Sequence, residues 1–108
     1  MAFRLTQKPT FVTRIDVETA NAKGGFDSSH FMCEFRRIDM EEHQRLIQEK
    51  PVDFLPNVIV GFTELIDDDG QQVEFNEVNL KILLSMPNVV ISLKNAFWAA
   101  VNKAKEKN

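Results

Sequence analysis

Few residue types in this 108-residue sequence could do chemistry: a single cysteine, two histidines and an acidic turn. Cys33 lies in an alternating apolar run, and His30 and His43 form no recognisable metal-binding motif with it. Cys33 and His43 could serve acyl transfer only if the fold brought the two side chains together. A buried, unreactive thiol fits the apolar run better. The sequence therefore predicts no catalytic residue, no metal site and no cofactor.

The segment Asp67-Asp68-Asp69-Gly70 is the closest approach to a metal-binding motif, the calcium loop of an EF-hand. If Gly70 holds the invariant glycine position of that loop, the first ligand position falls on Leu65 and the last on Asn76. Neither residue supplies the carboxylate that calcium needs there. We therefore expect a solvated turn.

The composition favours one domain over residues 1–108, with ragged ends at 1–10 and 103–108. Hydrophobic residues make up 44% of the chain and charged residues 27%, which is typical of a small globular protein. The net charge of -3 gives no overall attraction for nucleic acid or for an anionic membrane. Basic residues interrupt every early apolar run, so we expect no signal peptide, no membrane-spanning segment and a cytoplasmic protein.

The N-terminal third alternates apolar and polar side chains, which predicts an antiparallel β-hairpin. Its inward positions are Phe11, Thr13, Ile15, Val17, Phe31, Cys33 and Phe35. An unpaired edge along residues 11–18 or 31–37 would favour self-association.

Charge pairing suggests the register of this hairpin. The predicted inward pairs are Val17 with Phe31, Ile15 with Cys33, and Thr13 with Phe35. This register sets Arg14 opposite Glu34, whereas a slip of two residues would set Asp16 opposite Glu34.

Residues 20–29 predict a long, flexible loop between the two strands, because they contain Gly24-Gly25 and small polar residues. Phe26 is the one large apolar residue in that segment. Its ring either folds back on the hairpin, the interpretation that we favour, or anchors a binding partner.

The middle of the chain predicts short helices and a second hairpin. Asp39 and Glu42 have capping-box spacing at the start of a helix over residues 40–49. Residues 53–59 fit either a short helix capped by Asp53, with Pro56 in its first turn, or a strand. Asp69-Gly70 is typical of the turn of a short hairpin between residues 63–66 and 73–75.

The C-terminal third predicts two more helices. Asn76 can cap the first, and Pro87 can begin the second. The inward positions are Leu80, Leu83, Leu84, Val90, Leu93, Phe97, Val101 and Ala104. Trp98 is rotated about 100° from the stripe of Phe97, so it either covers the hairpin or faces a partner. The predicted fold is α+β, with two hairpins and three to four helices, one of them C-terminal.

The order of elements over residues 60–100 resembles the tail assembly chaperones of long-tailed bacteriophages. In that family a Gly-Trp-like pair, an acidic glycine turn, a Phe or Pro-Phe, an Asn-Leu helix and a closing Ala-Phe helix follow one another. The corresponding segments here are Gly61-Phe62, Asp67-Asp68-Asp69-Gly70, Phe75, Asn79-Leu80 and Ala96-Phe97. Phe62 stands where the family often has Trp, a change that keeps an aromatic core residue.

The resemblance implies a non-enzymatic chaperone. Such a protein binds the tape measure protein, keeps it soluble while tail tube subunits assemble around it, and is then released. It would act in the cytoplasm of the bacterial host, would be absent from the mature virion, and would self-associate. The tail tube protein is a further possible partner, and Phe26 and Trp98 are the candidate partner-binding residues. The resemblance also implies that a short form and a longer frameshifted form can both be made.

Two other classes of function stay open. A structural tail or tail-completion subunit would also be small and acidic, but it would persist in the virion. A regulator that binds nucleic acid would need a basic face, which could lie only around Arg36, Arg37, Arg45 and Lys50.

Overall fold

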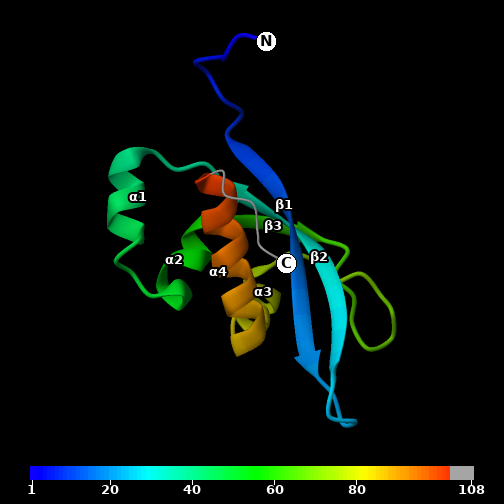
Figure 1. The fold of residues 1–108 in the computed structure, drawn as a ribbon. Helices are drawn as coiled ribbons and strands as arrows, with labels where there is room; N and C mark the ends of the chain where they lie inside the picture. Colours follow the sequence, from blue (N-terminus) through cyan, green and yellow to red (C-terminus); the bar gives the residue numbers. More distant parts are fainter. Residues whose placement is uncertain (103–108) are drawn as a thin grey trace.

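The computed structural model describes residues 1–102, which form an α+β fold of one antiparallel sheet and four helices (Figure 1). The elements are β1 (Thr10–Ala20), β2 (Phe26–Arg36), α1 (Met40–Leu46), α2 (Pro51–Val58), β3 (Ile59–Thr63), α3 (Glu77–Leu83) and α4 (Pro87–Val101). The predicted fold class is confirmed, including the N-terminal hairpin and the C-terminal helix. Ala104 and the ragged end predicted for 103–108 lie outside the described residues.

The loop between β1 and β2 is much shorter than the predicted 20–29. Ala20 already pairs with Phe26, so only residues 21–25 connect the strands. Asn21 builds this turn: its N–H donates to the carbonyl of Gly25, and its side-chain oxygen accepts from the N–H groups of Lys23 and Gly25. Gly24 takes a left-handed conformation at φ 84°, which suits a glycine.

The predicted register of the hairpin is wrong by two residues. The observed pairs are Ile15 with Phe31, Thr13 with Cys33, and Phe11 with Phe35. Arg14 consequently lies opposite Met32 and not opposite Glu34. The turn built by Asn21 fixes the register, and an exposed ion pair of about 0.2–1 kcal/mol is too weak to override it.

The inward face of the hairpin is nevertheless the predicted one. Ile15, Val17, Phe31, Cys33 and Phe35 are buried, and Phe11 and Thr13 are half-buried. A two-residue shift leaves every side chain on its original face, because the period of a strand is two.

The predicted second hairpin is reduced to a single bridge between Ile66 and Gln72. The strand before it, β3, pairs antiparallel with β2, so β2 is the central strand of the order β1-β2-β3. The acidic turn between Ile66 and Gln72 is held by the side chain of Asp67, whose Oδ1 accepts from the N–H groups of Asp69 and Gln71.

The starts of α1, α3 and α4 follow the predicted caps, but α1 ends at Leu46 and not at the predicted residue 49. The side chains of Asp39 and Asn76 accept the N–H groups of Glu42 and Asn79, and Pro87 begins α4. The ambiguous segment 53–59 is mostly helical: α2 begins at Pro51, contains Pro56, and is capped by Lys50 and not by Asp53.

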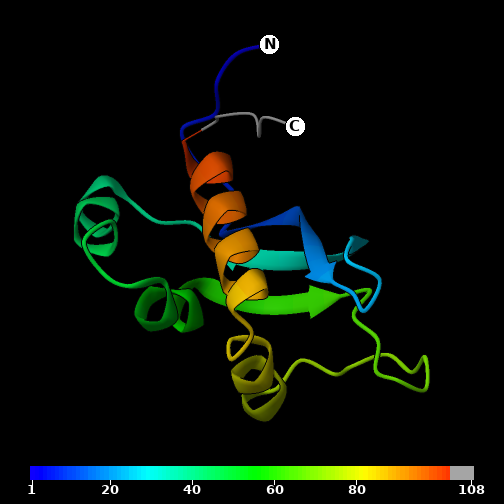
Figure 2. The ribbon, with the colours of Figure 1, turned by 60° about the horizontal axis from the view of Figure 1, so that its bottom comes forward.

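α4 crosses the inner face of the sheet and completes the core (Figure 2). The fully buried ring of Phe97 lies 5.1 Å from that of Phe35, 5.8 Å from that of Phe54 and 6.4 Å from that of Phe11, measured between centroids. Leu93 and Leu83 are buried as predicted, while Leu80, Leu84, Val90 and Val101 pack half-buried against the core. One ring therefore joins β1, β2, α2 and α4.

We predict that Phe97→Ala lowers the free energy of unfolding by about 3–5 kcal/mol, because it leaves a cavity at the meeting point of four elements. Ile91→Ala is the matched control, since Ile91 lies on the same helix and is 56% exposed. Its effect should stay within about 0.5 kcal/mol. Urea unfolding of both variants measures the difference, and equal effects would contradict this account of the core.

Candidate protein-binding surfaces

The reactive residue types do not form a catalytic or metal-binding cluster in the part of the chain that the structure describes. Cys33 is 1% exposed, and its burial raises the pKa of the thiol to about 12, so the thiol is protonated at neutral pH. His43 lies on α1, where its Nε2 is 3.0 Å from Oδ1 of Asn102. Within residues 1–102, no group of three or more His, Cys, Asp or Glu side chains could hold a metal ion.

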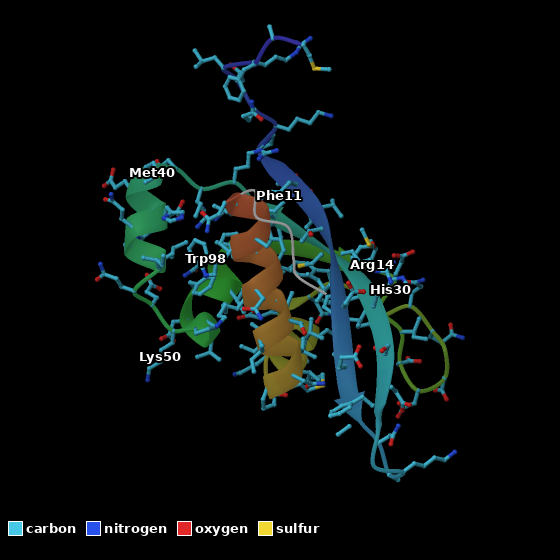
Figure 3. All side chains as sticks on the ribbon, in the orientation of Figure 1. Phe11, Arg14, His30, Met40, Lys50 and Trp98 are labelled. Atoms are coloured by element: carbon cyan, nitrogen blue, oxygen red, sulfur yellow. The ribbon has the colours of Figure 1, made fainter. Side chains whose placement is uncertain are left out.

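Trp98 packs against α1 and α2 and does not cover the hairpin (Figure 3). Its ring centroid lies 5.5 Å from that of Phe54 and 5.1 Å from that of His43, with an edge-on geometry to His43. The ring is half-buried and belongs to the rim of the core. The prediction that Trp98 lies off the Phe97 stripe is confirmed. The two predicted neighbours of Trp98 were the hairpin and a binding partner. Neither prediction included α1, because no sequence pattern specifies the position of that helix.

Phe26 lies at the first position of β2, next to the hairpin turn, and is 69% exposed. The favoured interpretation, in which the ring folds back on the hairpin, is therefore wrong. The hairpin tip projects away from α1 in both Figures 1 and 2. The structure thus separates Phe26 from Trp98, and the two cannot belong to one compact binding site.

An apolar groove lies between α2 and α3. Its volume is about 480 Å³, and it is lined by Val52, Pro56, Glu77, Leu80, Lys81, Leu84 and Ser85. The apolar lining residues come from both helices, and the charged ones come from α3. α3 also exposes Val78 and Ile82, which lie one helical turn apart. No sequence pattern indicates the groove, because α2 and α3 are joined by β3 and a long turn and meet only in the folded protein.

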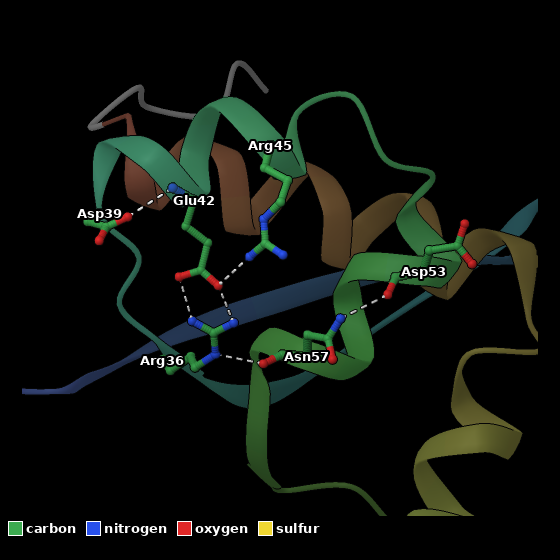
Figure 4. Close-up of polar contacts among 6 residues, drawn as sticks. All are labelled: Arg36, Asp39, Glu42, Arg45, Asp53 and Asn57. Atoms are coloured by element: carbon green, nitrogen blue, oxygen red, sulfur yellow. Dashed lines mark hydrogen bonds and ion pairs between the residues drawn. The ribbon is translucent and has the colours of Figure 1, made fainter.

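A network around Arg36 fixes the position of α2, one wall of the groove (Figure 4). The guanidinium of Arg36 makes a bidentate pair with Glu42 of α1, and its Nε donates to the carbonyl of Asn57 in α2 at 2.7 Å. Arg45 adds a contact to the same carboxylate at 3.3 Å. One side chain of β2 thereby connects the sheet to both α1 and α2.

Comparison of the chain with models of protein families, with curated proteins and with solved structures found no match. Among residues 1–102, no single helix is long and apolar enough to cross a membrane, and α3 and α4 meet that length only as a pair bent by 100°.

We predict that Glu42→Gln lowers stability at neutral pH but has a smaller effect in acid. Hydrogen bonds from Arg36 hold the pKa of Glu42 below its ordinary value of 4.5. A lowered folded-state pKa contributes stability above the ordinary pKa, and this contribution is lost as pH falls through the folded pKa. Thermal unfolding from pH 7 to pH 3 measures the difference between the wild type and the variant, and a difference that does not shrink would contradict the ion-pair account.

Trp98→Ala and Phe26→Ala should differ in their effect on stability, because Trp98 packs against two helices and Phe26 is exposed. We expect Trp98→Ala to lower the free energy of unfolding by about 3 kcal/mol, because the ring packs on two helices. Phe26→Ala should change it by less than about 0.5 kcal/mol. Chemical denaturation measures the free energy of unfolding of both variants. A Trp98→Ala protein as stable as the wild type would show that Trp98 is a free surface residue and not part of the packing.

Proposed function

We propose that this protein is a non-enzymatic tail assembly chaperone of a long-tailed phage or prophage, which binds the tape measure protein and keeps it soluble during tail tube assembly. The observation that carries the proposal is the open apolar groove between α2 and α3. It is the kind of surface that binds protein segments.

The residues that carry the family resemblance hold structural positions that support the proposal. Phe62 is buried in β3, and Gly61 faces the side chain of Glu34, which would lie 3.4 Å from a Cβ at that position. Asn79 donates to the carbonyl of Glu74 and so joins α3 to the preceding turn. The motif residues thus maintain the fold, as they would in a family that has a shared architecture and no catalytic signature.

The groove suits a helical segment of the partner. Its lining residues come from the α2 and α3 segments, and four of them are apolar: Val52, Pro56, Leu80 and Leu84. An amphipathic helix can place its apolar face in such a groove. The polar lining residues Glu77, Lys81 and Ser85 can bond polar groups that flank the apolar stripe of such a helix. A long helical protein with repeated apolar stripes would offer many such segments.

The small size of the groove supports reversible binding. The groove is lined by seven residues, whereas a standard interface involves roughly 20–30 residues on each side, so a single copy would bind weakly. Several copies along one long partner would gain avidity, and each copy could still be displaced as tube subunits assemble. Phe26, with its exposed ring on a separate surface, is a second proposed contact, whereas Trp98 contributes by supporting α1 and α2.

We predict that Val52→Asp abolishes solubilisation of the tape measure protein in co-expression. Val52 is 51% exposed and lies in the first turn of α2, where an acidic residue suits the helix dipole, so the fold should be retained. A hot-spot loss of about 2 kcal/mol corresponds to roughly 30-fold weaker binding.

Ile91→Asp is the matched control, because Ile91 is similarly exposed on α4 and is absent from the groove lining. It should bind like the wild type. Unchanged binding by Val52→Asp would exclude the groove as the binding site for the tape measure protein. Failure of the wild-type protein to bind would exclude the proposed chaperone function. Mass spectrometry of purified virions distinguishes a chaperone, which is absent, from a structural tail subunit, which persists.

A further inference from the structure

β1 leaves one long edge of the sheet without a partner strand among the described residues. The hydrogen bonds at its two ends, from Asn21 N–H to Gly25 O and from Arg37 N–H to Pro9 O, show that odd-numbered residues of β1 bond with β2. The even-numbered residues therefore direct their N–H and C=O groups to the free edge. These residues are Thr10, Val12, Arg14, Asp16, Glu18 and Ala20.

The protein covers this edge near the end of β1 but not in the middle. Asn88 of α4 donates from Nδ2 to the carbonyl of Glu18 at 3.1 Å. No described residue bonds with the outward backbone groups of Val12, Arg14 or Asp16. An open stretch of this kind is a template for pairing with another strand.

We infer that two copies of this chain pair their β1 edges antiparallel, around a two-fold axis at Ile15, and so join their sheets into one. The occupant of the edge is a second copy because the edge is complementary to itself. With the axis at Ile15, Arg14 of each copy lies opposite Asp16 of the other, and both are residues whose backbone groups point outward. Each Arg14–Asp16 pair then exchanges both backbone hydrogen bonds.

Charge excludes the neighbouring registers. An axis at Arg14 would set that residue opposite itself, and an axis at Asp16 would do the same for the carboxylate; like charges directly opposite each other destabilise a strand pair. An axis at Val17 would set Asp16 opposite Glu18, and an axis at Thr13 would leave Arg14 opposite Val12 with no ionic partner. Of these registers, only the one with the axis at Ile15 sets both Arg14 and Asp16 opposite a side chain of the opposite charge.

The same two side chains are already paired within one strand. Nε of Arg14 lies 2.8 Å from Oδ1 of Asp16, with 59% and 57% of the side chains exposed. Both lie on the outer face of the sheet, and Figure 3 places Arg14 away from α4. When two copies pair, the Arg14–Asp16 contact within one strand is replaced by the same contact between strands, and neither charge becomes buried. The ion pairs therefore add little, and the backbone hydrogen bonds stabilise the dimer. None of the groove residues lies on β1.

A charge exchange tests both the surface and its register. Sedimentation of the full chain over a range of concentrations should show a dimer that forms reversibly. Arg14→Asp sets acidic residues opposite each other, and Asp16→Arg sets basic residues opposite each other, so each should weaken the dimer about 10-fold or more. The double variant with both changes restores opposite charges across the axis and should restore the dimer.

Lys50→Asp is the matched control, because it changes the net charge as Arg14→Asp does, at the exposed cap of α2. It should dimerise like the wild type, and circular dichroism checks that every variant is folded. A wild-type protein that stays monomeric at high micromolar concentration would overturn the inference. So would association that both single variants leave unchanged, or a double variant that fails to recover.

Discussion

The packing of one aromatic ring, that of Phe97, determines how the elements of this protein are placed. Its contacts with Phe35 and Phe11 hold α4 on the sheet, and its contact with Phe54 holds α2 beside α4. Trp98, the next residue along the helix, extends the same cluster to His43 of α1. α3 precedes α4 by a link of only residues 84–86, so its position follows from that of α4. The groove between α2 and α3 is therefore a consequence of the core.

The two surfaces that the core leaves open serve different kinds of contact. The groove is apolar and concave, and it suits a helical segment of another protein. The edge of β1 is a row of backbone groups between charged side chains, and it suits a strand. Because one surface lies between helices and the other at the border of the sheet, a chain can engage a partner and a second copy together. Linked copies would bind a long repetitive partner with a higher avidity than single ones.

Local sequence patterns predicted the buried face of the hairpin and three helix starts, but not the short loop at residues 21–25, the single bridge in place of a second hairpin, or the tertiary arrangement. Period-two alternation identified the buried face of the hairpin, and the caps at Asp39 and Asn76 and the start at Pro87 were correct, since each depends on a few neighbouring residues. The predicted register of the hairpin was wrong because it was chosen from charge pairing between the strands, whereas the side chain of Asn21 builds the turn that sets the observed register. The exposure of Phe26 and the packing of Trp98 depend on where whole elements lie, and so does the groove, which joins residues from segments far apart in the chain.

Hydrogen exchange of the chain with and without the tape measure protein tests most directly whether the groove between α2 and α3 binds that partner. The chain concentration is held constant, so that any self-association at β1 is the same in both samples. We predict slower exchange on binding in α2 and α3, at residues 51–58 and 77–83, with little change in the turn at residues 21–25. Unchanged exchange in both helices, or protection confined to the hairpin, would contradict the account.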